Sequence, residues 1–91
     1  MIDSIQVELG QVISIKTINV LKEQLDDVLE QKKSVVLLSN NVDQVDTAAV
    51  QLLVAFNEKL KSNGFTLSWE QPSEEVCSVV ALLGLEKAVS L

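Results

Sequence analysis

The sequence has no histidine, no arginine and no tyrosine, and it has a single cysteine. Without histidine, a His-based general base, a catalytic triad and a His-ligated metal site are all excluded. One cysteine forms no disulfide within the chain and supplies too few thiolates for a multi-cysteine zinc or iron–sulfur site. The missing residue types remove most common catalytic and metal chemistry, so we expect no cofactor and no metal.

Positive charge is scarce as well. The seven cationic residues are all lysines and stand against thirteen acidic residues, which gives a net charge of −6. Proteins that bind nucleic acids normally carry a basic stripe, often with arginine and aromatic residues. No such stripe is present in this sequence, so we expect no nucleic-acid partner.

Long hydrophobic runs are missing too. The longest uninterrupted apolar runs, Leu52 to Phe56 and Val79 to Leu83, are far shorter than the roughly 20 residues of a membrane-spanning helix. The first residues, Met-Ile-Asp-Ser, lack the cationic and apolar regions of a signal peptide. We therefore expect a cytoplasmic protein without direct membrane insertion.

Apolar residues are nevertheless abundant, at 47% of the 91 residues. A chain of this length can bury about two-thirds of its unfolded surface. No repeat, low-complexity tract or Pro/Gly-rich linker divides it. We expect one domain that covers residues 1–91.

The spacing of the apolar residues predicts alternating strands and helices. Strands are expected over 4–9, 11–13, 35–38 and 65–69, and helices over about 15–31, 46–62 and 73–83, with a tail at 85–91 that docks on the core. Ser14 is the expected cap of the first helix, and the four apolar residues from Val35 to Leu38 predict a strand buried on both faces. Crossovers of this length place neighbouring strands parallel. The predicted fold is α/β, a small mostly parallel sheet of about four strands with about three main helices packed on it.

The start of the second predicted helix carries an acid and a hydroxyl. Asp46 suits the N-cap, where its carboxylate accepts from a free N–H of the first turn. Thr47 then occupies the first helical position with its hydroxyl in solvent, where a phosphate would lie at the positive end of the helix dipole. The simpler interpretation, left open here, is that Asp-Thr is only a cap.

A helical wheel at 100° per residue predicts which residues of this helix face the core and which face solvent. It places Ala49, Leu52, Leu53, Phe56 and Leu60 on the core face. It places Val54, and partly Val50, on the solvent side beside the hydroxyl, and apolar residues there hint at a partner surface. The predicted partner-binding residues are Asp46, Thr47, Val50, Gln51 and Val54.

The stretch from Asp46 to Leu53, Asp-Thr-Ala-Ala-Val-Gln-Leu-Leu, resembles the Asp-Ser/Thr-x-Gly-Leu-x-x-Leu signature of the STAS domain, a family named from sulfate transporters and anti-sigma-factor antagonists. The strand and loop before it have matching lengths, and the order of elements after it also matches. The resemblance covers about residues 5–91. Ala49 stands at the signature glycine, and Leu38 stands where a polar residue often ends the preceding strand.

The resemblance implies a non-enzymatic protein that binds a partner protein. In the anti-sigma-factor antagonists, the hydroxyl residue after the motif aspartate is phosphorylated by a serine kinase that is itself the anti-sigma factor. Phosphorylation releases the complex and a phosphatase restores it. Thr47 corresponds to that phosphorylation site and Asp46 to the acid before it. Other small members occur in chemotaxis operons, or bind the ATPase of a phospholipid-trafficking ABC transporter through the same helix.

Two function hypotheses follow from this resemblance. The first is a regulatory module that exchanges partners through phosphorylation of Thr47, with an anti-sigma factor or a chemotaxis protein as its partner. The second is a constitutive subunit bound to a transporter ATPase, in which Thr47 is a contact and not a switch.

Other candidate sites are weaker. Asp43 and Asp46 follow a predicted parallel strand, where a magnesium site or a phosphoacceptor aspartate is conceivable, but partner carboxylates at suitable spacing are missing. Cys77 lies on the flank of the third predicted helix and has no histidine or arginine to lower its pKa, so packing is the favoured interpretation. We expect no enzymatic activity.

Overall fold

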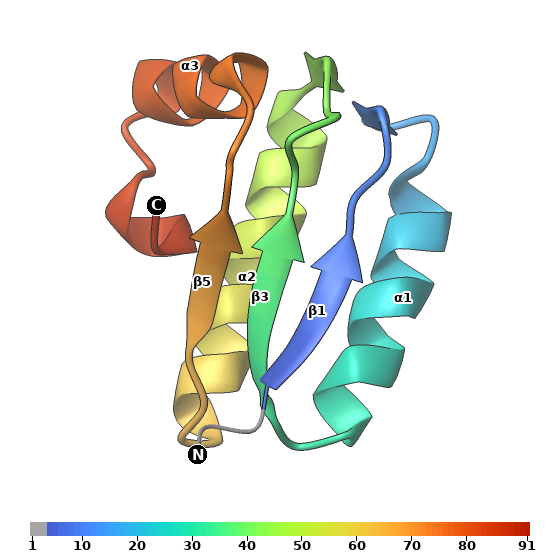
Figure 1. The fold of residues 1–91 in the computed structure, drawn as a ribbon, viewed down its shortest axis with the longest axis vertical. Helices are drawn as coiled ribbons and strands as arrows, with labels where there is room; N and C mark the ends of the chain where they lie inside the picture. Colours follow the sequence, from blue (N-terminus) through green and yellow to red (C-terminus); the bar gives the residue numbers. More distant parts are fainter. Residues whose placement is uncertain (1–3) are drawn as a thin grey trace.

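The computed structural model describes residues 4–91, in which one or two strands precede each of the main helices (Figure 1). The strands are β1 (Ser4–Glu8), β2 (Val12–Ile13), β3 (Ser34–Leu38), β4 (Gln44–Val45) and β5 (Leu67–Glu70). The helices are α1 (Ile18–Glu30), α2 (Thr47–Ser62), α3 (Glu74–Leu83) and a short 3-10 helix, η1 (Lys87–Val89). The predicted α/β class with its small parallel sheet is confirmed.

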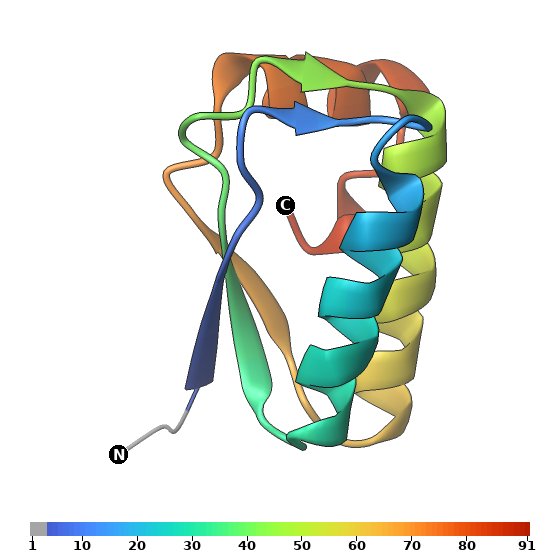
Figure 2. The same ribbon diagram turned by 90° about the vertical axis from the view of Figure 1, so that its right-hand side faces the viewer.

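The main sheet has β3 at its centre, with β1 on one side and β5 on the other, and both pairs are parallel. The two crossovers, through α1 and through α2, step across the sheet in the same direction. Because such connections are right-handed, both helices lie on the same face of the sheet, as Figure 2 shows. The result is a two-layer arrangement in which α2 packs behind the centre of the sheet.

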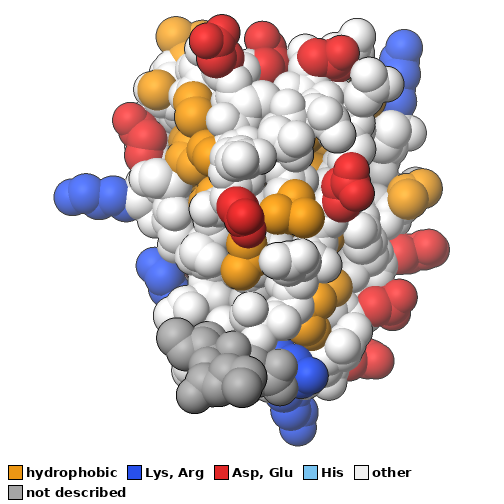
Figure 3. Space-filling model, viewed as in Figure 1, with side chains coloured by type: hydrophobic (Ala, Val, Ile, Leu, Met, Phe, Trp, Pro, Cys, Tyr) orange, Lys and Arg blue, Asp and Glu red, His pale blue; other side chains and the backbone are white. Residues whose placement is uncertain are grey.

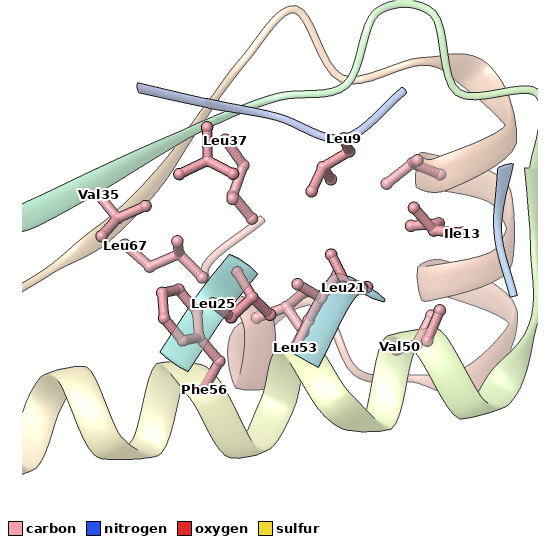
Figure 4. Close-up of a cluster of buried hydrophobic side chains, with 14 of the residues drawn as sticks. Leu9, Ile13, Leu21, Leu25, Val35, Leu37, Val50, Leu53, Phe56 and Leu67 are labelled. Carbon is pink, nitrogen blue, oxygen red and sulfur yellow. The ribbon is translucent and has the colours of Figure 1, made fainter. Parts of the chain in front are cut away.

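The core fills the space between this sheet and the two helices. Side chains that alternate along the strands, such as Val35 and Leu37 of β3 and Leu67 of β5, point toward Leu25 of α1 and Phe56 of α2 (Figure 4). Val35 and Leu37 have no exposed surface. Every second side chain of the strands therefore packs against the apolar faces of α1 and α2, and together they form one apolar layer.

The opposite face of the sheet is open, so the prediction that β3 is buried on both faces is wrong. Val36 and Leu38 point to this open face and are half-buried. Their neighbours in the register are polar, with Val36 between Gln6 and Ser68, and Leu38 beside Glu8. Figure 3 looks onto this face, where patches of hydrophobic side chains lie between acidic and uncharged ones. The polar flanking strands cover the apolar central strand in place of a second layer of helices.

A second small sheet closes one end of the molecule. β2 pairs with β4 in parallel, Val12 with Gln44 and Ile13 with Val45. The strand β2 was expected, but β4 was not, because its first residue falls in a polar stretch that reads as a loop. α3 packs against β4 and α2 at this same end (Figure 1). This end of the fold holds the first turn of α2.

Helix α1 begins at Ile18, three residues later than predicted, and Ser14 is not its cap. Ser14 and Thr17 form a turn instead: the Ser14 N–H donates to Thr17 Oγ1 at 3.1 Å, and the Thr17 N–H donates to the Ser14 carbonyl at 2.9 Å. These two bonds, one to the Thr17 hydroxyl and one between backbone groups, hold residues 14–17 in a compact loop before the helix. We call residues 14–17 the β2–α1 loop.

The C-terminal tail docks on the core, as expected, and two side-chain donors hold it, one from half-buried Trp69 and one from buried Asn57. The Trp69 indole N–H donates to the Val89 carbonyl at 2.7 Å, so it does not face solvent. Asn57, a buried residue of α2, donates from Nδ2 to the Ala88 carbonyl and to Ser90 Oγ, each at 3.0 Å. Val89 itself has no exposed surface. Polar side chains therefore fix the position of an apolar tail.

Candidate functional site

Asp46 is the N-cap of α2, which confirms the local prediction. Its backbone is extended (φ −121°, ψ 174°), and its Oδ1 accepts from the Ala49 N–H at 3.1 Å. The cap satisfies one of the four N–H groups that have no partner within the helix. The carboxylate charge also lies at the positive end of the helix dipole.

The second oxygen of the same carboxylate makes a long-range contact. Asp46 Oδ2 accepts from the Ile15 N–H at 2.8 Å, across 31 positions of sequence. The pairing of β2 with β4 brings the two residues together, and the Asp46 N–H donates to the Ile13 carbonyl at 3.3 Å beside it. One carboxylate therefore joins the first turn of α2 to the β2–α1 loop. Local sequence patterns carry no signal for this bond, because it depends on the unpredicted strand β4.

The β2–α1 loop presents an apolar side chain to solvent next to this bond. Ile15 is 63% exposed, and it is one of three large hydrophobic residues with such exposure among residues 4–91; the other two are Val20 and Leu82. Because Asp46 directly precedes Thr47, the Ile15 backbone lies beside the first residue of α2. No motif or apolar spacing in the sequence indicates that Ile15 belongs to the site.

Thr47, Gln51 and Val54 form what we call the α2 surface. Thr47 is the first residue of α2 and is exposed, and no hydrogen bond within residues 4–91 engages its hydroxyl. Gln51 is also exposed, and Val54 is half-buried. The spacing of four and three residues places the three side chains on one face of the helix. Thr47 and Gln51 have the exposure expected from the helical wheel, whereas Val54, expected on the solvent side, is half-buried and packs against the core.

Val50 corrects the helical-wheel prediction. It has no exposed surface and belongs to the core, so it does not contact a partner in this conformation. Figure 4 shows Val50 and Ile13 at the same end of the core. The wheel assumed one flat core face, but the small sheet and α3 close over this end of α2 and bury a further arc of the helix. The wheel also placed Leu52 on the core face, but Leu52 is only half-buried.

Ala49, which replaces the glycine of the STAS signature, lies in the core of the protein. Ala49 has no exposed surface, so its methyl group packs in the core and does not change the α2 surface. Leu38 ends β3 on the open face of the sheet and is half-buried. Neither residue therefore lies beside the Thr47 hydroxyl on the exposed face of α2.

Asp43 and Cys77 are the remaining candidate residues. Asp43 is exposed and its N–H donates to the Gln11 carbonyl at 2.9 Å. Across residues 4–91, no group of three or more acidic or cysteine side chains is placed to hold a metal ion. Cys77 is half-buried in α3, in agreement with a packing role. In the same described part of the chain, no helix combines the length and the apolar character needed to cross a membrane.

Comparison with known families agrees with this arrangement. The family model described as "Mlab, STAS domain" matches residues 3–91. The chain belongs to the STAS domain family. No curated protein matches it. STAS domains are generally non-catalytic modules that mediate protein–protein interaction, and the family thus supports a general regulatory or binding role for this chain.

Proposed function

We propose that this STAS protein is a partner-switching module that binds a protein through the α2 surface and is released by phosphorylation of Thr47. The observation that carries the proposal is the exposed Thr47 hydroxyl, which no other residue of the described chain engages. A hydroxyl in this state is accessible to a kinase. Its modification also breaks no hydrogen bond made by the hydroxyl itself, because the described residues form none with it.

The position favours a phosphate in physical terms. A phosphothreonine carries about −1.5 to −2 charges near neutral pH, and at the first residue of a helix it meets the positive end of the dipole. In the transfer, the Thr47 oxygen takes the γ-phosphoryl group of a nucleoside triphosphate, the hydroxyl proton goes to solvent, and the diphosphate leaves. Hydrolysis by a phosphatase returns the hydroxyl and inorganic phosphate.

The same group would expel a partner. Val54 is apolar and half-buried, and Gln51 is uncharged, so a complementary surface would be largely uncharged opposite them. A dianion on Thr47 would have to be desolvated on binding, next to the Asp46 carboxylate. The proposed partner is therefore a protein that senses charge at the first turn of α2, with an anti-sigma-factor kinase or a chemotaxis protein as the leading classes.

A second candidate is a constitutive subunit bound to the ATPase of a phospholipid-trafficking ABC transporter. One observation favours it. The Asp46 carboxylate already occupies the Ala49 N–H and lies at the helix N-terminus, so less of the dipole remains for a phosphate. In that case Thr47 would contact the ATPase directly and stay unmodified.

Capture of partners from host lysate separates the two candidates. Wild type, Thr47→Ala and Thr47→Glu serve as baits, and mass spectrometry tests for phosphate on Thr47. The switch predicts phosphate on Thr47, retention of the partner by Thr47→Ala and a loss of about tenfold or more in affinity for Thr47→Glu, equal to about 1.4 kcal/mol.

Ser68→Glu is the matched control, because Ser68 is exposed on the open face of the sheet, away from α2. It adds the same charge and should bind normally. If Thr47 carries no phosphate in any condition and Thr47→Glu binds like wild type, the switch is wrong. Recovery of a transporter ATPase with all baits would then support the second candidate.

A further inference from the structure

We infer that Asp46 couples the chemical state of Thr47 to the β2–α1 loop, so that a phosphate on Thr47 releases the Ile15 N–H from the Asp46 carboxylate. The inference concerns the regulation of the α2 surface and rests on the proposed phosphorylation of Thr47. In addition to the change of charge at Thr47, the β2–α1 loop would lose its hydrogen bond to Asp46. That segment carries Ile15, which is 63% exposed.

The Asp46 carboxylate accepts hydrogen bonds from two segments, the first turn of α2 and the β2–α1 loop. Oδ1 accepts from the Ala49 N–H at 3.1 Å in α2, and Oδ2 accepts from the Ile15 N–H at 2.8 Å in the loop. Because both oxygens belong to one planar group, a rotation of the Asp46 side chain breaks both bonds together. The bond to Ile15 is solvent-exposed, so water can replace it at once.

The rest of the β2–α1 loop is held by its own turn. Thr17 Oγ1 accepts from the Ser14 N–H at 3.1 Å, and Ser14 Oγ accepts from the Lys16 N–H at 3.2 Å. Among the hydrogen bonds of the described residues, only the one from Ile15 to Asp46 joins residues 14–17 to α2. Loss of that bond frees the loop from α2 without unfolding the turn.

A phosphate on Thr47 acts directly on this carboxylate. It adds a dianion to the residue next to Asp46, and the two like charges repel. It also offers three strong acceptor oxygens to the same N–H groups of the first turn that Asp46 caps. The carboxylate is therefore displaced toward solvent while the phosphate takes over the cap, and the Ile15 N–H loses its acceptor.

The test uses the full chain with phosphoserine incorporated at position 47, and Thr47→Ser as its unmodified reference. Amide hydrogen exchange is followed by NMR at Ile15, Ala49 and Val76. The Ile15 exchange rate is expected to rise about tenfold or more, the factor for losing a hydrogen bond to a charged acceptor. The Val76 amide is the internal control, because it donates to the Ser73 cap of α3 at 3.2 Å and should not change.

Asp46→Asn calibrates the measurement without a phosphate. Asparagine caps helices as well as aspartate does, but its amide has only one acceptor oxygen, so only one of the Ala49 and Ile15 amides can keep its partner. If both amides stay protected in Asp46→Asn, or if the Ile15 amide stays protected beside phosphoserine 47, the coupling is wrong. Because phosphoserine is installed directly, this result does not depend on whether the host phosphorylates Thr47, which the lysate experiment tests separately.

Discussion

The buried amide of Asn57 gives the sharpest test of the packing that holds the C-terminal tail. Asn57 is 1% exposed, its Nδ2 donates to the Ala88 carbonyl and to Ser90 Oγ, and its Oδ1 has no partner among the described residues. Asn57→Asp keeps the shape of the side chain but replaces the donor with a carboxyl oxygen. An ionised carboxylate there would face the Ala88 carbonyl without a donor between them.

The neutral acid is therefore favoured in the folded state, and the pKa of the new carboxyl group is raised above its unfolded value of about 3.9. Below that value both states are protonated, so the difference in stability from wild type does not change with pH. As the pH rises, the unfolded state releases its proton while the folded state retains it. Each pH unit then lowers the free energy of unfolding by about 1.4 kcal/mol, until the folded pKa is reached.

From about pH 4 to about pH 7 the accumulated loss can reach about 4 kcal/mol, which is most of the stability of a marginal domain. Urea unfolding at several pH values measures it through the fluorescence of Trp69, the only tryptophan. Asn57→Leu is the control, because it removes the same donor and cannot titrate, so its difference from wild type should not depend on pH. An Asn57→Asp penalty that is equally flat with pH would refute the burial argument.

The other predictions concern the N-terminal cap of α2 and the assignment of its faces. Asp46→Ala loses both a helix cap and the bond to Ile15, so it should lower the free energy of unfolding by about 2 kcal/mol, against about 1 kcal/mol for Ser73→Ala, which removes only the cap of α3. Equal losses in urea unfolding would mean that the Ile15 bond contributes nothing. Val50→Ala should cost about 2 kcal/mol because Val50 is fully buried, whereas Val54→Ala should stay within about 0.5 kcal/mol of wild type and weaken partner capture. The reverse order of the two losses would restore the original helical-wheel assignment.

Much of the fold follows from residue patterns within short windows. The alternation of Ile5 and Val7 matches β1, and the helical spacing of Leu21, Leu25 and Val28 matches α1. The caps at Asp46 and Ser73 are also local, since each acceptor lies three residues from its donor. Such features depend on near neighbours in the chain, and one sequence contains that information.

The features that were missed depend on what packs against an element from elsewhere. β4 is only Gln44 and Val45, and it exists because β2 lies beside it. Val50 is buried because the small sheet and α3 close over one end of α2, which no wheel of α2 alone contains. The open face behind Val36 has the same origin. An apolar run of four indicates burial, but the polar neighbours Gln6 and Ser68 supply part of the cover.

Asp46 and Thr47 are adjacent, but they differ in how much the fold depends on their side chains. Asp46 is engaged at both oxygens, so its removal costs stability whether or not a partner binds. Thr47 makes no hydrogen bond within the described chain through its hydroxyl, so its modification costs the fold little directly. The proposed switch combines the two properties in adjacent residues: a group that is free to change, and a neighbour whose bonds that change would disturb. The resemblance to the STAS signature identified the pair, and the bond from Ile15 to Asp46 supplies the physical reason why a change at the first residue of α2 would be transmitted beyond the helix.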